Sequence, residues 1–390
     1  MTYMEGSMFS ERIQRLSGSL IREILAAAQR PGVISFAGGL PAADRLPELD
    51  WHAAPRALAQ YGTSEGEPGL RAKLAAQVSA LGLPCAAEQV LVLTGSQQTL
   101  DLAAKLFVDP GTPVLVEQPT YLAALQVFRL FGADCLGVPL TPRGIDLAAF
   151  EARLQARRPA LAYLIPTFQN PSGARYDEAT RDAVAALLDR YEVPLLEDEP
   201  YRELSFDGKT ATPIAARLNK APWIYTGTLS KVLAPGLRDA FLVASPELFP
   251  YLVKLKQAAD LHSCRHAQWQ AEQWLGSERL AEHVDGLIGF YRGRRDAMQA
   301  ALERHFAELA DWNTPEGGLF FWLRLKRRVD TRTLLPAALE ADVAFMPGEP
   351  FFAEPDDGIG HLRLNFSHAP DARIDEGIAR LAAILRAAGA

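Results

Sequence analysis

Short apolar stretches alternate with helix-length segments from about residue 65 to residue 245, and this alternation constrains the fold more than any other feature. Alternation of this kind is typical of an α/β domain with a mainly parallel sheet. It predicts a large domain with a mainly parallel seven-stranded sheet flanked by helices. The expected strands are residues 89–94, 113–117, 134–138, 160–165, 193–197, 223–228 and 239–244. The expected helices between them include residues 97–107, 119–131 and 176–191.

The pattern changes on either side of this region and predicts a smaller α+β domain. The expected elements are an N-terminal helix at 12–29, a short strand from Ile34, a long amphipathic stretch at 248–310, strands near 319–325, 342–346 and 361–366, and a last helix at 371–387. We expect the N-terminal segment, residues 1–47, to pack with the small domain. The large domain is then predicted to span residues 48–275 and the small C-terminal domain residues 276–390.

Composition excludes several classes of partner. The chain has 390 residues, a net charge of −7 and no clustering of its Lys and Arg residues, so we expect neither nucleic acid nor a membrane as a partner. No apolar run approaches the roughly 20 residues that span a bilayer, and the N-terminus lacks a signal pattern. Three cysteines without metal-ligand or redox spacing favour the cytoplasm and give no metal site.

A strand, a glycine turn and a helix follow one another at Val90–Thr99. Gly95 permits a tight turn, which places Ser96 and Gln97 at a helix N-terminus, where free N–H groups attract an anion. The alternative is a serine that caps the helix and binds no ligand.

The segment Tyr225-Thr-Gly-Thr-Leu-Ser-Lys-Val-Leu-Ala-Pro-Gly-Leu-Arg238 is the most informative in the chain. Lys231 follows a predicted strand and lies among small and apolar residues. Burial makes a lysine a better nucleophile toward carbonyl groups, because it lowers the pKa of the amine. Thr228, Ser230 and Arg238 around it are groups that suit a phosphate. The alternative is a lysine in a surface loop, which is where most lysines lie.

Polar residues also follow other predicted strands. Asp198 and Tyr201 lie at the carboxyl end of one strand, where a carboxylate is costly unless it pairs with a positive group. Asn170 precedes a proline and is therefore extended. Arg363 alternates with its neighbours on a C-terminal strand, where it could hold a carboxylate or form an internal salt bridge.

The ordered set of motifs resembles the class I/II aminotransferases, which are fold-type-I enzymes dependent on pyridoxal 5'-phosphate. The set comprises Gly-Ser-Gln, Pro-Thr-Tyr, Asn-Pro-Ser-Gly, Asp-x-x-Tyr, Ser-Lys-x6-Arg and Arg-Leu-Asn-Phe. Within the family the chain is most similar to the 2-aminoadipate and kynurenine aminotransferases. That likeness is carried by Leu20–Leu25, Ile34–Pro41 and Phe168–Gly173.

The resemblance implies a role for each candidate residue. Lys231 would bind the cofactor as a Schiff base and move the proton at the substrate Cα, with Asp198 on the pyridine nitrogen. The other implied cofactor contacts are Asn170 and Tyr201 on the phenolic oxygen, Tyr121 on the ring face, Ser96, Gln97, Ser230 and Arg238 on the phosphate, and Tyr61 on the phosphate of the neighbouring subunit. The implied substrate contacts are Arg363, Asn170 and the Gly39 backbone for the α-carboxylate, and Arg22 for a distal carboxylate.

These roles predict an aminotransferase that works as a homodimer with shared active sites. It would move the amino group of 2-aminoadipate, an aromatic or a branched-chain L-amino acid to a 2-oxo acid such as 2-oxoglutarate. One alternative is a lyase that uses the same cofactor on the same fold, since the cofactor supplies the chemistry. Another is a non-catalytic effector domain that binds the cofactor. His262 and His266 have a spacing that could bind a metal, but the sequence shows no third ligand.

Overall fold

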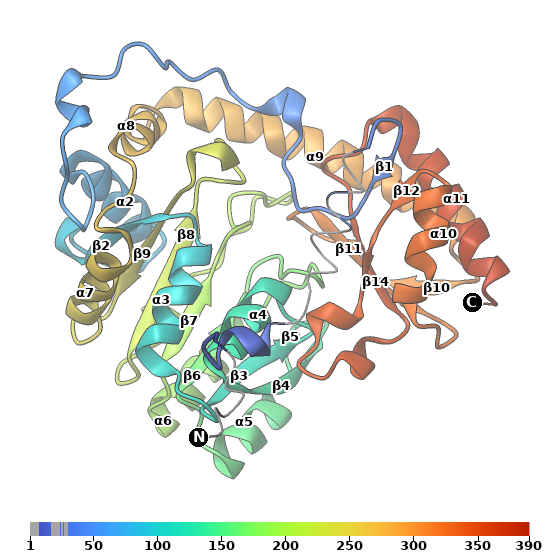
Figure 1. The fold of residues 1–390 in the computed structure, drawn as a ribbon, viewed down its shortest axis with the longest axis horizontal. Coiled ribbons are helices and arrows are strands. Elements are labelled where there is room, and N and C mark those ends of the chain that lie inside the picture. The colour runs from blue at the N-terminus through green and yellow to red at the C-terminus, as the bar shows by residue number, and fades with distance from the viewer. Residues whose placement is uncertain (1–7, 17–23, 25, 27–29, 390) are drawn as a thin grey trace, which may run out of the picture.

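An eight-stranded sheet forms the centre of the molecule in the computed structural model, which describes residues 8–16, 24, 26 and 30–389 (Figure 1). The five central strands are mutually parallel, and β9 and β5 run antiparallel to their neighbours. The strand order is β2 (Val90–Thr94), β9 (Asp239–Ala244), β8 (Trp223–Thr228), β7 (Leu195–Asp198), β6 (Leu161–Leu164), β3 (Pro113–Gln118), β4 (Asp134–Thr141) and β5 (Gly144–Ile145). All seven predicted strands are confirmed, and the two-residue β5 extends the sheet by a hairpin.

Helices cover both faces of this sheet and bury its apolar side chains. On one face lie α3 (Gln97–Phe107), α4 (Leu122–Phe131) and α7 (Phe249–Asp260). On the other lie α2 (Pro68–Ala80), α5 (Leu147–Ala156), α6 (Glu178–Tyr191) and α8 (Arg265–Trp274). The fold class predicted from the alternating pattern is therefore confirmed.

Asp146 and Asp177 show why two of the helices begin where they do. The Asp146 carboxylate accepts hydrogen bonds from the backbone N–H groups of Ala148 and Ala149, and Asp177 accepts one from Thr180. Each bond satisfies an N–H group that has no partner within its helix.

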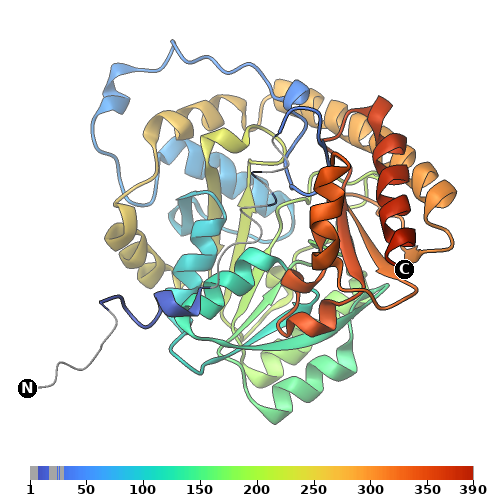
Figure 2. The ribbon, with the colours of Figure 1, turned by 45° about the vertical axis from the view of Figure 1, so that its right-hand side comes forward.

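A second, smaller sheet lies beside the first and carries the C-terminal helices (Figures 1 and 2). Its antiparallel strands are β10 (Ala310–Trp312), β11 (Phe320–Leu325), β14 (His361–Asn365) and β13 (Met346–Pro347). The helices are α9 (Glu278–His305), α10 (Leu335–Glu340) and α11 (Asp371–Ala387), of which α9 and α11 pack together. The N-terminal strand β1 (Ile34–Ser35) pairs in parallel with β12 (Val343–Ala344), so this part of the N-terminal segment lies against the C-terminal elements. The earlier turn at Ile13–Arg15 lies instead against α4 of the large domain, where Arg15 donates a hydrogen bond to the Leu130 carbonyl.

Two predicted helical stretches differ from the structure. In the expected helix at 12–29, the first residues form a 3₁₀ turn at Ile13–Arg15, after which Leu16 is extended. Ile24 and Ala26 are helical, as predicted, and the other residues of 17–29 lie outside the described residues. The stretch at 248–310 forms three helices, because Leu261 and Gly276 have positive φ angles of 68° and 76° that end α7 and the α8 region. None of the helices that the structure describes combines the length and apolarity needed to cross a membrane.

Short 3₁₀ segments complete the described structure. They are η1 (Ile13–Arg15), η2 (Ala43–Arg45), η3 (Arg56–Ala59), η4 (Ala87–Gln89), η5 (Ala215–Arg217), η6 (Pro235–Leu237), η7 (Thr331–Leu334), η8 (Glu349–Phe351) and η9 (Pro355–Gly358).

Candidate active site

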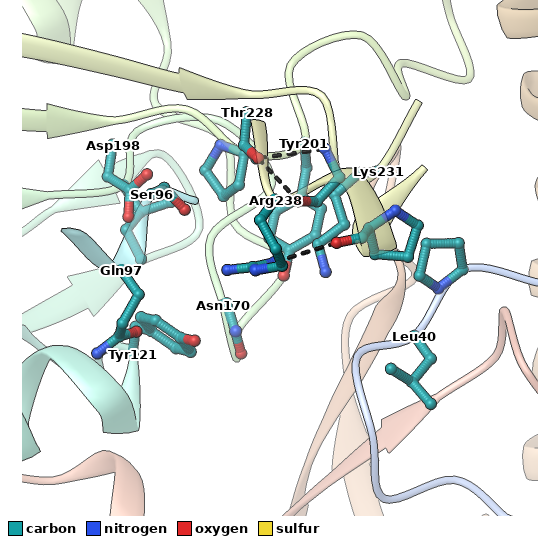
Figure 3. Close-up of a pocket in the computed structure, with 15 residues that line it drawn as sticks. Leu40, Ser96, Gln97, Tyr121, Asn170, Asp198, Tyr201, Thr228, Lys231 and Arg238 are labelled. Atoms are coloured by element: carbon teal, nitrogen blue, oxygen red, sulfur yellow. Dashed lines mark hydrogen bonds between the residues drawn. The ribbon is translucent and has the colours of Figure 1, made fainter. Parts of the chain in front are cut away.

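A cavity of about 220 Å³ lies at the edge of the large sheet where the parallel strands end (Figure 3). Ends of parallel strands are the usual ligand site of such sheets. The lining residues are Leu40, Pro41, Ser96, Gln97, Tyr121, Ile165, Asn170, Asp198, Pro200, Tyr201, Thr228, Ser230, Lys231, Pro235 and Arg238. Nine of the predicted site residues are among them, so segments far apart in the sequence converge on one site.

Four predicted site residues do not line the cavity. Gly39 borders it, because its carbonyl oxygen accepts a hydrogen bond of 2.8 Å from Lys231 Nζ. Arg363 lies behind Asn170, to which it donates a hydrogen bond. Tyr61 lies apart and is 76% exposed. Arg22 lies outside the described residues.

Lys231 is placed by the end of β8, three residues after Thr228. Its amine lies 5.9 Å from the centre of the Tyr201 ring. Burial, together with the positive charges of Arg363 and Arg238, lowers the pKa of Lys231 to about 8. A larger fraction of this amine is therefore neutral near pH 8 than of an ordinary lysine, as nucleophilic attack requires.

Asp198 is the last residue of β7 and is 4% exposed. The Tyr163 hydroxyl donates a hydrogen bond of 2.9 Å to its Oδ2, whereas Oδ1 has no hydrogen-bond partner in the described part of the chain. Burial raises the pKa of Asp198 to about 7, and the hydrogen bond from Tyr163 opposes this rise. The free oxygen is a place for a positive or N–H-bearing group of a ligand, because such a buried atom is costly when left unpaired.

The turn from β2 into α3 presents groups that suit an anion. Gly95 has a φ of +80°, which brings Ser96 to the N-terminus of α3. The Ser96 side chain makes no capping hydrogen bond, so the alternative of a purely capping serine does not apply. Arg238 lies against this turn: a Cβ on Gly95 would come within 2.0 Å of its Nη2. Across the turn, the Thr228 hydroxyl donates a 3.0 Å hydrogen bond to Ser230 Oγ.

Arg363 is 4% exposed and lies between two aromatic rings. Its guanidinium carbon is 4.2 Å from the centre of the Phe320 ring and 5.0 Å from that of Phe351. Nη1 donates to Asn170 Oδ1 at 2.9 Å and Nη2 to the Ala37 carbonyl at 2.6 Å. Among the described residues no carboxylate forms a salt bridge with Arg363, which argues against the alternative of an internal ion pair. Burial lowers the pKa of this arginine to about 10.

Sequence reasoning missed the apolar part of the lining and one supporting residue. Ile165, Pro200 and Pro235 line the cavity but carry no chemical group that would mark them. Tyr163 supports Asp198 from the neighbouring strand, 35 residues earlier. Only the register of β6 against β7 reveals that contact.

Comparison with known proteins places the chain in a family. The model of the class I and II aminotransferases matches residues 31–381, and the chain belongs to this family. It is 40% identical to the 2-aminoadipate transaminase of Thermus thermophilus, over 97% of this chain and 96% of that protein. It is 38% identical to aromatic-amino-acid aminotransferase 1 of Thermococcus litoralis, over 97% and 94%.

Solved structures agree with this assignment. A kynurenine aminotransferase of Pyrococcus horikoshii, crystallised with PMP, superposes with a TM-score of 0.91 at 34% identity and covers 98% of this chain and 97% of that one. The chain is thus a fold-type-I aminotransferase dependent on pyridoxal 5'-phosphate. The buried Lys231 amine and Asp198 Oδ1, which has no partner among the described residues, fit this cofactor, which carries an aldehyde and a basic ring nitrogen.

Proposed function

We propose that this aminotransferase accepts 2-aminoadipate, aromatic and branched-chain L-amino acids as donors and a 2-oxo acid such as 2-oxoglutarate as acceptor. The names of the similar proteins, which cover aminoadipate, aromatic amino acids and kynurenine, support a broad donor range. The observation that carries the proposal is Arg363, a buried cation without a carboxylate partner among the described residues, hydrogen-bonded to Asn170 beside Lys231. A bidentate guanidinium suits the α-carboxylate that all these substrates share.

The polar residues predicted to contact the cofactor then have a proposed role toward it. When bound, pyridoxal phosphate supplies an aldehyde carbon that condenses with amines and a ring that accepts electron density from Cα. Asp198 Oδ1 holds a proton at the pyridine nitrogen. The remaining contacts are Asn170 and Tyr201 with the phenolic oxygen, Tyr121 with the ring face, and Ser96, Gln97, Ser230 and Arg238 with the phosphate.

Lys231 has two proposed tasks. Its amine holds the cofactor covalently between turnovers, and it is then free to move a proton at the substrate Cα once the substrate has taken its place. The lowered pKa keeps the amine able to accept that proton near neutral pH. Arg363, Asn170 and the Gly39 backbone fix the substrate so that its Cα–H bond points toward this amine.

An acidic donor needs a second cation for its distal carboxylate. Among the described residues that line the cavity, the cations are Lys231 and Arg238, and both have other proposed roles. We therefore propose that Arg22 pairs with the distal carboxylate of 2-aminoadipate or 2-oxoglutarate. Apolar donors would not engage it.

We also propose a homodimer in which Tyr61 of one subunit contacts the cofactor phosphate of the other. Its 76% exposure supports this, since a tyrosine this exposed is available for a contact with another chain.

We further propose a cytoplasmic location. The cysteines Cys85, Cys135 and Cys264 are all free, which supports this location.

The function is tested by a single half-reaction. Holoenzyme mixed with 2-aminoadipate, phenylalanine or leucine, without any 2-oxo acid, should release one keto acid per active site and no ammonia. A lyase would instead turn over repeatedly or release ammonia.

The Lys231→Ala variant should bind the cofactor without a covalent link. In the same assay its rate should fall by about 100- to 10,000-fold, as expected for loss of a general acid–base group. Borohydride labelling of another lysine would contradict the assignment.

A further inference from the structure

A buried carboxylate lies beneath the cavity and is not part of its lining. Glu117, the second-to-last residue of β3, is 1% exposed. Its Oε1 accepts hydrogen bonds from the Tyr176 hydroxyl at 2.7 Å and from the Ile165 backbone N–H at 3.1 Å. Its Oε2 accepts one from Gln169 Nε2 at 2.9 Å. All three donors lie in the chain that follows β6.

The Gln169 side chain is fully buried and uses both ends of its amide. Nε2 donates to the Pro119 carbonyl at 2.8 Å as well as to Glu117. Oε1 accepts from the Ser172 backbone N–H at 2.9 Å and from its hydroxyl at 2.6 Å. A primary amide has two donors and two acceptor positions, so this amide is saturated. Its orientation is set by Glu117 and Pro119, which both require a donor.

This amide joins two segments that reach the cavity. Pro119 lies two residues before Tyr121, and Gln169 lies immediately before Asn170. Both Tyr121 and Asn170 line the cavity. Asn170 also accepts the hydrogen bond from Arg363, so its position affects the proposed substrate site too.

We propose that Glu117 is a positioning residue for transamination. By orienting the Gln169 amide, it fixes the positions of the Asn170 and Tyr121 side chains relative to the cofactor. This inference rests on the proposed contacts of Asn170 and Tyr121. A hydrogen bond to the ionised phenolic oxygen stabilises that form and keeps the pKa of the bound cofactor low. Glu117 therefore acts at a distance on the acidity of the cofactor and on the rate of the chemical step.

The isosteric change Glu117→Gln isolates this effect. In one orientation its new NH₂ faces the NH₂ of Gln169, and in the other it faces the Ile165 N–H. If Gln169 turns over instead, its oxygen faces the Pro119 carbonyl and its NH₂ faces the Ser172 N–H. No arrangement satisfies every group, and a buried polar group without a partner drives a shift of the surrounding chain.

The measurement is a pH titration of the absorption of the bound cofactor in the holoenzyme, together with kcat and KM for phenylalanine. We expect Glu117→Gln to raise the titration midpoint by about 0.5 to 1 pH unit. We expect kcat to fall about 5- to 10-fold because the reacting groups are displaced. Asn170→Ala, measured in parallel, should raise the midpoint at least as much. If Asn170→Ala leaves the midpoint unchanged, the proposed cofactor contact fails, and this inference with it.

Two further variants separate positioning from general destabilisation. Tyr176→Phe removes the hydrogen bond that the tyrosine donates to Glu117 Oε1. Because Gln169 contacts the other oxygen, Oε2, this variant should lower thermal stability without moving the midpoint. The double variant E117Q/Q169E restores a donor–acceptor pair between the two side chains and keeps the oxygen that accepts both bonds from Ser172. It leaves the Pro119 carbonyl without its donor, so only part of the midpoint shift should be recovered. If Asn170→Ala moves the midpoint and Glu117→Gln does not, the inference is overturned. It is also overturned if Tyr176→Phe moves the midpoint as far as Glu117→Gln.

If Glu117→Gln does not fold, the same test uses Ser172→Ala. Ser172 is half-buried, and its hydroxyl contributes only one of the bonds that fix the Gln169 amide. A smaller upward shift of the midpoint supports the inference, and an unchanged midpoint contradicts it.

Discussion

One carboxylate oxygen of Asp198 accepts a hydrogen bond from Tyr163, and the other has no partner among the residues that the structure describes. In the Asp198→Asn variant the side chain keeps its size but no longer carries a negative charge beside the pyridine nitrogen. We expect kcat to fall about 100- to 1000-fold, the loss typical of removing one electrostatic contact with developing charge. Stopped-flow measurement of the first half-reaction gives the rate of the chemical step.

Tyr163→Phe is the matched control for this variant. It removes the hydrogen bond to Oδ2 but keeps the charge of Asp198, so the rate should fall far less. A rate for Asp198→Asn close to that of the parent enzyme would show that Asp198 is not the partner of the ring nitrogen.

Lys231 is expected to titrate well below an ordinary lysine. Its pKa of about 8 in the cofactor-free protein compares with an ordinary value of 10.5. Because only the neutral amine attacks an aldehyde, the rate at which apoenzyme binds pyridoxal phosphate covalently should rise with pH and level off above about pH 8. Arg363→Gln should move this midpoint upward, since the charge of Arg363 contributes to the lowered pKa. A midpoint near 10.5 in the parent protein would contradict the burial of this amine.

The residues predicted from sequence to contact the cofactor were those with chemically distinctive side chains that follow predicted strands. Lys231, Asp198 and Asn170 could be placed together because parallel strands end at the same edge. Glu117 and Gln169 could not, because their contact spans 52 residues and depends on the detailed path of two loops. The sequence pattern shows which residues reach the edge of the sheet, but not which buried side chains hold them in position by hydrogen bonds.

At the scale of elements, strands were predicted more closely than the helices around them. The last helix, α11, has its predicted bounds of 371–387. In contrast, α4 begins at residue 122 and not at 119, because Tyr121 is still extended. The short strand β10 was missed, since three residues are too few to show an alternating pattern. The end of α7 was hidden as well, because Leu261 adopts a positive φ that its residue type does not suggest.

The turn between β2 and α3 allows a prediction about this element. Gly95→Ala introduces a Cβ at a φ of +80° and within 2.0 Å of Arg238 Nη2. Because a residue with a Cβ disfavours the left-handed conformation, the free energy of unfolding should fall by about 1–2 kcal/mol. The mobile guanidinium should move aside, so the affinity for pyridoxal phosphate should fall at least about 10-fold, as expected for loss of a charge-assisted hydrogen bond. Equilibrium dialysis of the cofactor provides the measurement.

Gly111→Ala is the control for backbone strain in this experiment. Gly111 has a similar φ of +84°, but a Cβ there would meet nothing within 4 Å. Its variant should lose similar stability and keep the cofactor affinity of the parent. If both variants bind the cofactor equally well, the turn at Gly95 does not place Arg238 at the phosphate.

At the scale of the whole molecule, the chain between β1 and α2 runs as a long arm along the outside of the structure (Figure 1). This arm carries the exposed apolar side chains of Leu46, Trp51 and Tyr61. Large apolar side chains gathered on one exposed segment are available for contact with another chain. The arm therefore supports the proposed homodimer, in which Tyr61 would reach the cofactor of the partner subunit.

Shared active sites predict complementation between two inactive variants. Lys231→Ala lacks the catalytic amine, and Tyr61→Ala should bind cofactor too weakly to work when cofactor is scarce. In a mixed dimer one site carries both defects, whereas the other combines an intact Lys231 with an intact Tyr61 from the second chain. Random reassociation should therefore restore about a quarter of the parent activity, because half of the dimers are mixed and each has one intact site. Sedimentation at assay concentration checks that the subunits are dimeric and that they exchange. If exchanged dimers show only the summed activity of the two variants, each active site is built from one chain and Tyr61 acts within its own subunit or not at all.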